Sequence, residues 1–187
     1  MNDGLIPSRY AKALYKFTLE KKVSKEIYEA ALRLETSFSS EQGGKLKEVV
    51  SNPYVSDSVK REIIMTASGI DGKSTEASSA LNDFITLLFK NNRISDLRGI
   101  VNAYVSLYLK ENKISRVHVT WASTPESSGE ERLKSMIKER IGNGTMEYSS
   151  SVNPSLIGGF KIAIDNEQLD ASIENELRQL RHQLLSK

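Results

Sequence analysis

Apolar side chains recur at a helical spacing through most of the first 113 residues. In the segment 9–22, Tyr10, Ala13, Leu14 and Phe17 occupy the i, i+3, i+4 and i+7 positions of one helix face. At about 100° per residue, the polar residues of this segment fall into one narrow stripe. The pattern predicts a helix that is contacted on most of its sides, with Leu14 central in its apolar arc and Ala13 and Phe17 at the edge.

The same spacing predicts five further helices before residue 113. They are expected at residues 24–38, 46–50, 57–67, 76–91 and 95–111. Asn52-Pro53 should end the third helix, because the residue before a proline is pushed out of the helical region. Ser56 is the expected N-cap of the fourth. In the fifth helix, Leu88 lies at the centre of the apolar face, and Phe84 and Leu87 lie toward its edge.

Near residue 113 the period of the pattern changes from 3.6 to 2. Val117, Val119 and Trp121 alternate with polar residues, which predicts a half-buried strand. A capping-box spacing over 128–131 opens a helix, two strands are expected near 146–148 and 160–164, and a last helix starts near Ser172. That helix carries Ile173, Leu177, Leu180 and Leu184 on one face, and the acidic residues Asp165, Glu167 and Asp170 are expected in a solvated turn.

The predicted fold is mainly α. A six-helix bundle over residues 1–113 is followed by a small α/β C-terminal domain over 114–187. The 26 basic and 24 acidic side chains leave a net charge of +2, which argues against a dedicated nucleic-acid binder. Apolar runs stay far below the ~20 residues that span a bilayer, and residues 1–8 do not resemble a signal peptide, so we expect an intracellular chain without membrane insertion.

Candidate catalytic chemistry is sparse. Cysteine is absent, and neither His118 nor His182 has a second ligand at metal-binding spacing, so no metal, cofactor or catalytic residue is expected. The segment 69–74 (GIDGKS) briefly resembles a phosphate-binding loop. The motif requires a glycine where Ala67 stands and a strand where a helix is expected, so we interpret the segment as a loop between helices.

Four segments, taken in order, resemble the delta subunit of F-type ATP synthases, whose mitochondrial counterpart is the oligomycin-sensitivity-conferring protein. The segments are 9–15 (RYAKALY); 52–56 (NPYVS), leading to Lys60-Arg61; 84–88 (FITLL) with 91–94 (NNRI); and 153–160 (NPSLIGGF) with 169–173 (LDASI). The last is the most specific. The chain departs from the family pattern in three places. Asn153 stands where the family tends to have aspartate, residues 171–173 (ASI) stand where it tends to have glycine, serine and valine, and the stretch 121–125 (WASTP) after the first strand is unusual.

The resemblance implies a non-catalytic peripheral-stalk subunit, held at the cytoplasmic face of the inner (plasma) membrane. Its domain 1–113 would bind the alpha-beta catalytic head and the N-terminal helix of an alpha subunit, and its domain 114–187 would bind the C-terminal ends of the b subunits. The alternative is a small helical adaptor of another assembly, which would have no reason to carry the segment 156–160.

Two sets of residues follow as candidates. An amphipathic partner helix is recognised through apolar positions at i, i+3, i+4 and i+7, so edge positions of two neighbouring helices can line a groove for a third. The partner-binding candidates are Tyr10, Ala13, Phe17, Phe84 and Leu87. The paired Gly158 and Gly159 are structural candidates, since paired glycines entering a strand indicate positive φ angles or a close backbone approach.

Overall fold

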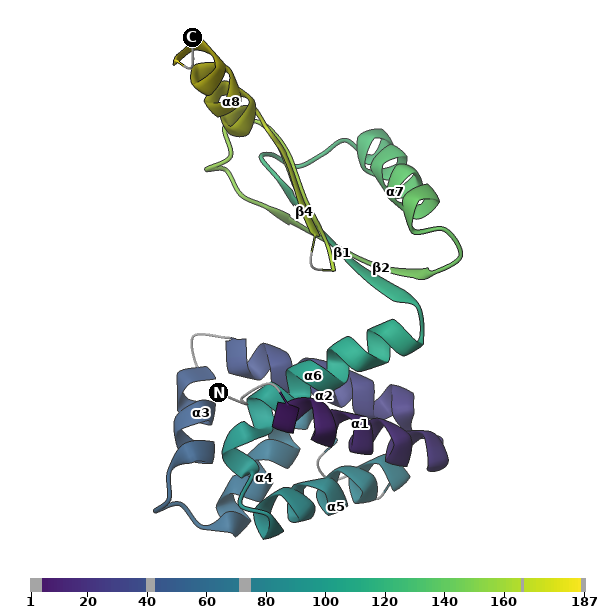
Figure 1. Cartoon of the computed structure of the whole chain (residues 1–187), viewed down its shortest axis with the longest axis vertical. Coiled ribbons are helices and arrows are strands. Elements are labelled where there is room, and N and C mark those ends of the chain that lie inside the picture. Colours follow the sequence, from purple (N-terminus) through teal and green to yellow (C-terminus); the bar gives the residue numbers. More distant parts are fainter. Residues whose placement is uncertain (1–4, 40–42, 71–74, 166, 186–187) are drawn as a thin grey trace. The chain divides into compact units, whose positions relative to one another are not determined.

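The computed structural model describes residues 5–39, 43–70, 75–165 and 167–185 of the chain. Within these residues the protein is mainly helical, with eight α-helices and one four-stranded mixed sheet (Figure 1). The chain divides into two compact units, residues 1–108 and 109–187.

The first unit is built from helices joined by short turns. Its elements are α1 (Leu5–Glu20), α2 (Ser24–Ser39), α3 (Gly43–Ser51), α4 (Asp57–Ser68), α5 (Glu76–Lys90), the short 3₁₀ helix η1 (Ile94–Asp96) and α6 (Leu97–Glu111), whose last turn enters the second unit. Helix α1 begins four residues earlier than the sequence pattern predicts. Pro7 lies in its first turn, where proline removes no intrahelical hydrogen bond.

The ends of α4 show which sequence signals control helix boundaries. Gly69 ends the helix in the left-handed conformation, with φ of 69°. Ser56 occupies the N-cap position, as expected, but its side chain does not cap the helix. Its hydroxyl instead lies 3.0 Å from the Ser58 hydroxyl. The position of the cap was therefore predictable, whereas its hydrogen bond was not.

The core of the first unit brings the inner faces of α1, α2, α5 and α6 together. Leu88 and Tyr104 are completely buried, as is the polar Thr18. The Thr18 hydroxyl donates to the Tyr15 carbonyl at 2.9 Å and lies 3.4 Å from the Tyr104 hydroxyl. The Tyr104 hydroxyl also donates to the Ser24 carbonyl at 3.3 Å. Burial raises the Tyr104 pKa to about 12, so the phenol stays neutral.

The second unit is a sheet with one helix packed on it and another at its end. Its elements are β1 (Ile114–Trp121), α7 (Ser127–Ile141), β2 (Thr145–Val152), β3 (Gly159–Ile164), β4 (Glu167–Ser172) and α8 (Ile173–Leu185). The strand order is β2-β1-β3-β4. Strands β1 and β2 are parallel and are connected through α7, whereas β3 pairs antiparallel with both of its neighbours.

The two faces of this sheet differ in character. On one face, Val117, Val119 and Ile162 form a core with Leu133 and Ile137 of α7. The opposite face is polar because side chains alternate along each strand. There His118 lies exposed between two serine hydroxyls of β2. Its Nδ1 atom lies 2.9 Å from the Ser149 hydroxyl, and its Nε2 atom lies 3.0 Å from the Ser151 hydroxyl.

Two local expectations for the second unit are wrong. Glu167 and Asp170 do not lie in a turn: they belong to β4, and only Asp165 of the acidic cluster lies in the turn, with φ of 51°. Strand β4 lies at the edge of the sheet, where polar side chains meet water, so its alternation is weak. Helix α7 begins at Ser127 with Glu126 as N-cap, so Ser128 lies inside the helix and forms no capping box.

Candidate partner-binding surfaces

One edge of α1 presents small and aromatic side chains beside exposed basic ones. Tyr10 and Phe17 are half-buried and Ala13 is exposed, whereas Leu14 next to it is buried. The Lys21 ammonium lies 5.8 Å from the centre of the Phe17 ring. A surface of this kind can accept an apolar helix face closely at Ala13, because alanine projects little side chain.

The matching edge of α5 lies on a helix that packs against α1. Leu87 is 42% exposed, which is unusual for a leucine on a helix with a fully buried neighbour such as Leu88. Phe84 is only 6% exposed and lines a small internal cavity of about 20 Å³ together with Leu14 and Ile100. Of the five candidates, Ala13 and Leu87 are thus the most exposed, and Phe84 supports the surface from beneath.

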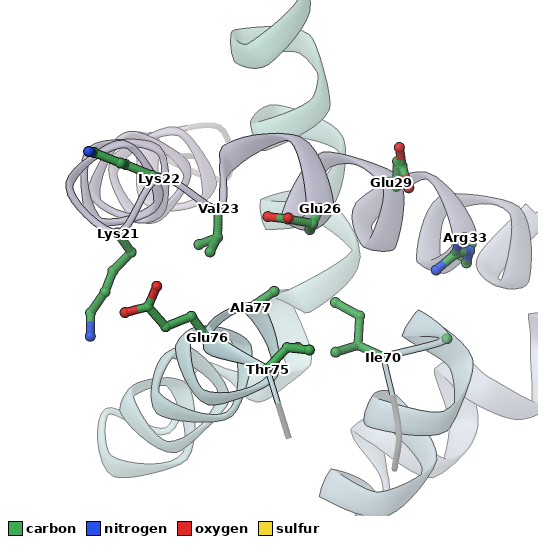
Figure 2. Close-up of a pocket in the computed structure, with 11 residues that line it drawn as sticks. Lys21, Lys22, Val23, Glu26, Glu29, Arg33, Ile70, Thr75, Glu76 and Ala77 are labelled. Atoms are coloured by element: carbon green, nitrogen blue, oxygen red, sulfur yellow. The ribbon is translucent and has the colours of Figure 1, made fainter. Parts of the chain in front are cut away.

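A pocket that the sequence analysis did not anticipate lies near the turn between α1 and α2 and the start of α5 (Figure 2). Its volume is about 480 Å³. The charged side chains that line it balance; they are Lys21, Lys22, Arg33, Glu26, Glu29 and Glu76. This balance favours neither an anion nor a cation. Arg33 is tied to α4, because its Nη1 atom donates to the Ser68 carbonyl at 3.3 Å.

The segment that resembled a phosphate-binding loop borders this pocket. Gly69 and Ile70 line the pocket, whereas residues 71–74 lie outside the described part of the chain. Gly69 serves as the C-terminal cap of α4, and the residues before it are helical. The described part of the segment therefore has the helix-loop geometry that we expected, without an upstream strand.

The two glycines Gly158 and Gly159 place the start of α8. Gly159 has a φ of 78°, and a Cβ atom there would collide with the Ala171 carbonyl oxygen. Gly158 has no positive φ, but a Cβ atom on it would lie 2.5 Å from Cδ1 of Ile173. The Ile173 amide donates to the Gly158 carbonyl at 3.1 Å. A positive φ is thus found at Gly159 alone, whereas neighbouring atoms approach the backbone closely at both glycines.

A polar network holds the first turn of α8. The Asp170 carboxylate accepts the Ser172 amide at 3.0 Å and also the Ser172 hydroxyl, and the Ser172 hydroxyl accepts the Asn175 amide at 3.3 Å. The Asn175 side chain donates to the Asp170 carbonyl, and the Lys161 ammonium lies 3.0 Å from the carboxylate. The hydrogen bond from the Ser172 hydroxyl, followed by Lys161, lowers the Asp170 pKa below its ordinary value.

An apolar groove of about 310 Å³ lies between α7 and the β3–β4 hairpin. Met136 and Leu169 are 67% and 59% exposed, while Ile162 beneath them is buried. Arg140 and Glu167 approach to 3.6 Å at its rim. Sequence reasoning missed this groove because it depends on pairing between β3 and the unanticipated β4. The helix pattern also indicated Met136 as an inward-facing residue, which is wrong because Met136 is exposed, so the local pattern gave no signal for the groove.

The described residues contain no cluster of three or more histidine, cysteine or acidic side chains that could hold a metal ion. In the same residues, no helix is long and apolar enough to cross a membrane. His118 is exposed and bonded to serines only, and the side chain of His182 lies outside the described part of the chain. The polar side chains described above cap helix ends or form hydrogen bonds to neighbouring elements.

Two compact units with apolar side chains exposed on their surfaces are typical of a protein that binds other proteins. The family model described as "ATP synthase delta (OSCP) subunit" matches residues 6–184. The chain belongs to this family of structural, non-catalytic subunits, and it is accordingly a subunit of the peripheral stalk rather than an enzyme. The resemblance seen in the four sequence segments is confirmed.

Individual relatives agree over the full length. The chain is 36% identical to ATP synthase subunit delta of Parabacteroides distasonis, over 99% of this chain and 98% of that one. It is 34% identical to the protein of the same name from Bacteroides thetaiotaomicron, over 100% and 97% of the two chains. A chain in the cryo-EM structure of the Toxoplasma gondii mitochondrial ATP synthase hexamer shares its fold, with a TM-score of 0.69, 19% identity and coverage of 96% and 97%.

Proposed function

We propose that the two units link the catalytic head of the complex to the b subunits of the stalk. The first unit binds the alpha-beta catalytic head through the N-terminal helix of an alpha subunit, and the second binds the C-terminal ends of the b subunits. The six α-helices of the first unit act as one bundle, and the boundary near 113/114 separates two units that fold independently. The chain then works at the cytoplasmic face of the membrane, peripheral to it, without cofactor or nucleic acid.

The exposure of Ala13 and Leu87 on two neighbouring helices is the observation that carries the first half of this proposal. An amphipathic helix needs an apolar strip on which to lay its own apolar face. The half-buried Tyr10 and Phe17 widen that strip along α1. The exposed Lys12 and Lys16 follow it on the solvent side and offer partners for acidic residues of the incoming helix.

Ala13→Asp tests the surface. An unpaired carboxylate pressed against an apolar ligand face costs several kcal/mol. In the free protein the same carboxylate remains in water beside Lys12 and Lys16, so folding should change little. We expect at least ~100-fold weaker binding of an alpha N-terminal peptide, equivalent to about 2.7 kcal/mol, with an unchanged Tm. Titration calorimetry and thermal melting measure the two quantities.

Leu19→Asp is the matched control, because Leu19 is 50% exposed on another side of the same helix. It introduces the same charge and should leave peptide affinity within about twofold of the parent. Equal losses in both variants would indicate a general charge effect. Unchanged affinity in Ala13→Asp would place the binding surface elsewhere on the unit, and a collapsed Tm would show that Ala13 contributes to the core.

A further inference from the structure

The second unit contains two apolar surfaces that do not cover each other. One is the groove between α7 and the β3–β4 hairpin, with Met136 and Leu169 exposed. The other is on α8, where Ile173 and Leu177 are 44% and 55% exposed. In the sequence, leucines at 180 and 184 continue this face. Helix α8 packs mainly on β4, the strand that leads into it.

We propose that α8 has a second position, in which it folds back across β4 and covers this groove. The closed position would occupy a surface that a helical partner of the second unit needs, so α8 would act as an internal competitor. This competition rests on the function proposed above for the second unit, namely binding of the b subunits. The closure itself depends only on the geometry of this chain.

The dimensions of the elements suit the closed position. Strand β4 has six residues and spans about 20 Å at ~3.3 Å per residue. Helix α8 has 13 residues. Without its first turn, about nine helical residues remain, which span about 14 Å at 1.5 Å per residue and fit within the length of β4. A helix that returned along β4 would pass over Leu169 of β4 and beside Met136 of α7, which both line the groove.

Folding α8 back requires the chain to rearrange at one place, the start of the helix. Helix α8 follows β4 directly, and a strand and helix that pack antiparallel need a connection of about 2–6 residues. The first turn of α8 must therefore unwind to supply that connection. The hydrogen bonds among Asp170, Ser172 and Asn175 hold this turn in the open position. They distinguish the two positions, because closure breaks them and buries Leu177.

The charged side chains at the groove rim include one partner of opposite sign for the arginines of α8. The groove rim carries Glu167 on β4, which is 82% exposed at its side chain and only loosely paired with Arg140 at 3.6 Å. Helix α8 carries Arg178, whose present partner is Glu174 one turn earlier on the same helix. It also carries Arg181, which is exposed. In the closed position these arginines approach the β4 end that carries Glu167.

Chemical cross-linking of the full chain tests closure directly, because the natural sequence contains no cysteine. The variant Met136→Cys with Leu177→Cys, treated with a short bismaleimide at low protein concentration, should give an internally bridged monomer. The control His118→Cys with Leu177→Cys places one thiol on the opposite face of the sheet. We expect the first pair to bridge at least tenfold faster. Equal rates would overturn the proposal, and cross-linked dimers would identify a second copy as the occupant.

The competition is tested separately with a peptide that corresponds to the C-terminal end of the b chain. Leu177→Asp should disfavour closure and strengthen peptide binding at least twofold, which corresponds to a closed population of one half or more in the parent. Gln179→Asp, at an exposed polar position of α8, should leave binding unchanged. Weaker binding in Leu177→Asp would show that α8 helps the partner, and would overturn competition. If the thiols bridge rapidly but the parent and both variants fail to bind the peptide, closure stands and the proposed function of this unit fails.

Discussion

The two units bury their apolar side chains in different ways. In the first, helices surround a continuous core in which Leu88, Ile100 and Tyr104 have no exposure to solvent. In the second, one helix covers part of one sheet face, and its core consists of five buried residues with larger side chains packed around them. The first unit can therefore hold its shape by its own packing, whereas the second retains an uncovered groove. A bound partner should therefore stabilise the second unit more than the first.

Leu88→Ala should produce the largest effect and confine it to the first unit. Removing a fully buried leucine side chain costs about 2–5 kcal/mol of unfolding free energy. Far-UV circular dichroism follows mainly the helices of the first unit, and fluorescence of Trp121, the single tryptophan, follows the second. We expect the dichroism transition to move and the fluorescence transition to stay. A joint shift would show that the two units unfold together.

Leu87→Ala serves as the control for that variant. It removes the same number of atoms from the preceding residue of the same helix, where the leucine is already partly exposed. The loss of unfolding free energy should be well below that of Leu88→Ala. Comparable losses would contradict the distinction between core and surface positions on α5.

Gly159→Val should act on the second unit alone, with a loss of about 3 kcal/mol. A β-branched residue at φ of 78° is strained, and its Cβ atom would collide with the β4 backbone. The Trp121 transition should fall while the alpha-peptide affinity of the first unit is retained. Gly129→Ala is the matched control: its Cβ meets no atom within 4 Å, and alanine in a helix should add up to ~1 kcal/mol. A parental melt for Gly159→Val would contradict the structural role.

The smallest effect on stability is expected from lowering the pH, again in the second unit. The Asp170 pKa is lower in the folded protein than in the unfolded chain, so the charged form stabilises the fold. This contribution is complete above the unfolded pKa of about 3.9 and is lost as the pH falls through the lower folded value. The Trp121 transition of Asp170→Asn should depend less on pH over this interval than that of the parent. Identical pH profiles would exclude a role for this carboxylate.

The sequence predicted helices well where periodic apolar residues met a clear stop. The pair Asn52-Pro53 ends one helix, as expected, and Gly142 ends another. The sequence pattern did not predict β4. This six-residue edge strand has a single large apolar residue, Leu169, and therefore shows no alternation. Such a strand is specified by its partner β3, and pairing between distant backbone segments is not written in the local pattern.

The candidate surface was predictable to a similar extent. The angular position of Ala13 beside Leu14 correctly indicated an edge residue next to a buried one. The prediction that this helix is contacted on most of its sides is wrong, because only Ala11, Leu14 and Thr18 of α1 are buried. Phe84 is more buried than its place in the helix pattern suggested, because neighbouring helices reach around it. The apolar arc of one helix shows which residues turn inward, but the extent of cover depends on residues far away in the sequence.

The strand order makes β2 and β4 the two edge strands of the sheet, and these two edges differ in charge. Strand β4 carries acidic side chains at Glu167 and Asp170, which oppose the approach of another acidic strand, as charged edge residues do in general. Strand β2 ends in Ser149, Ser150, Ser151 and Val152, whose backbone faces outward along the opposite border without a charge nearby in that stretch. Edge-to-edge aggregation of this protein at high concentration would therefore begin at β2, and a single lysine placed at Ser150 would be the economical way to suppress it.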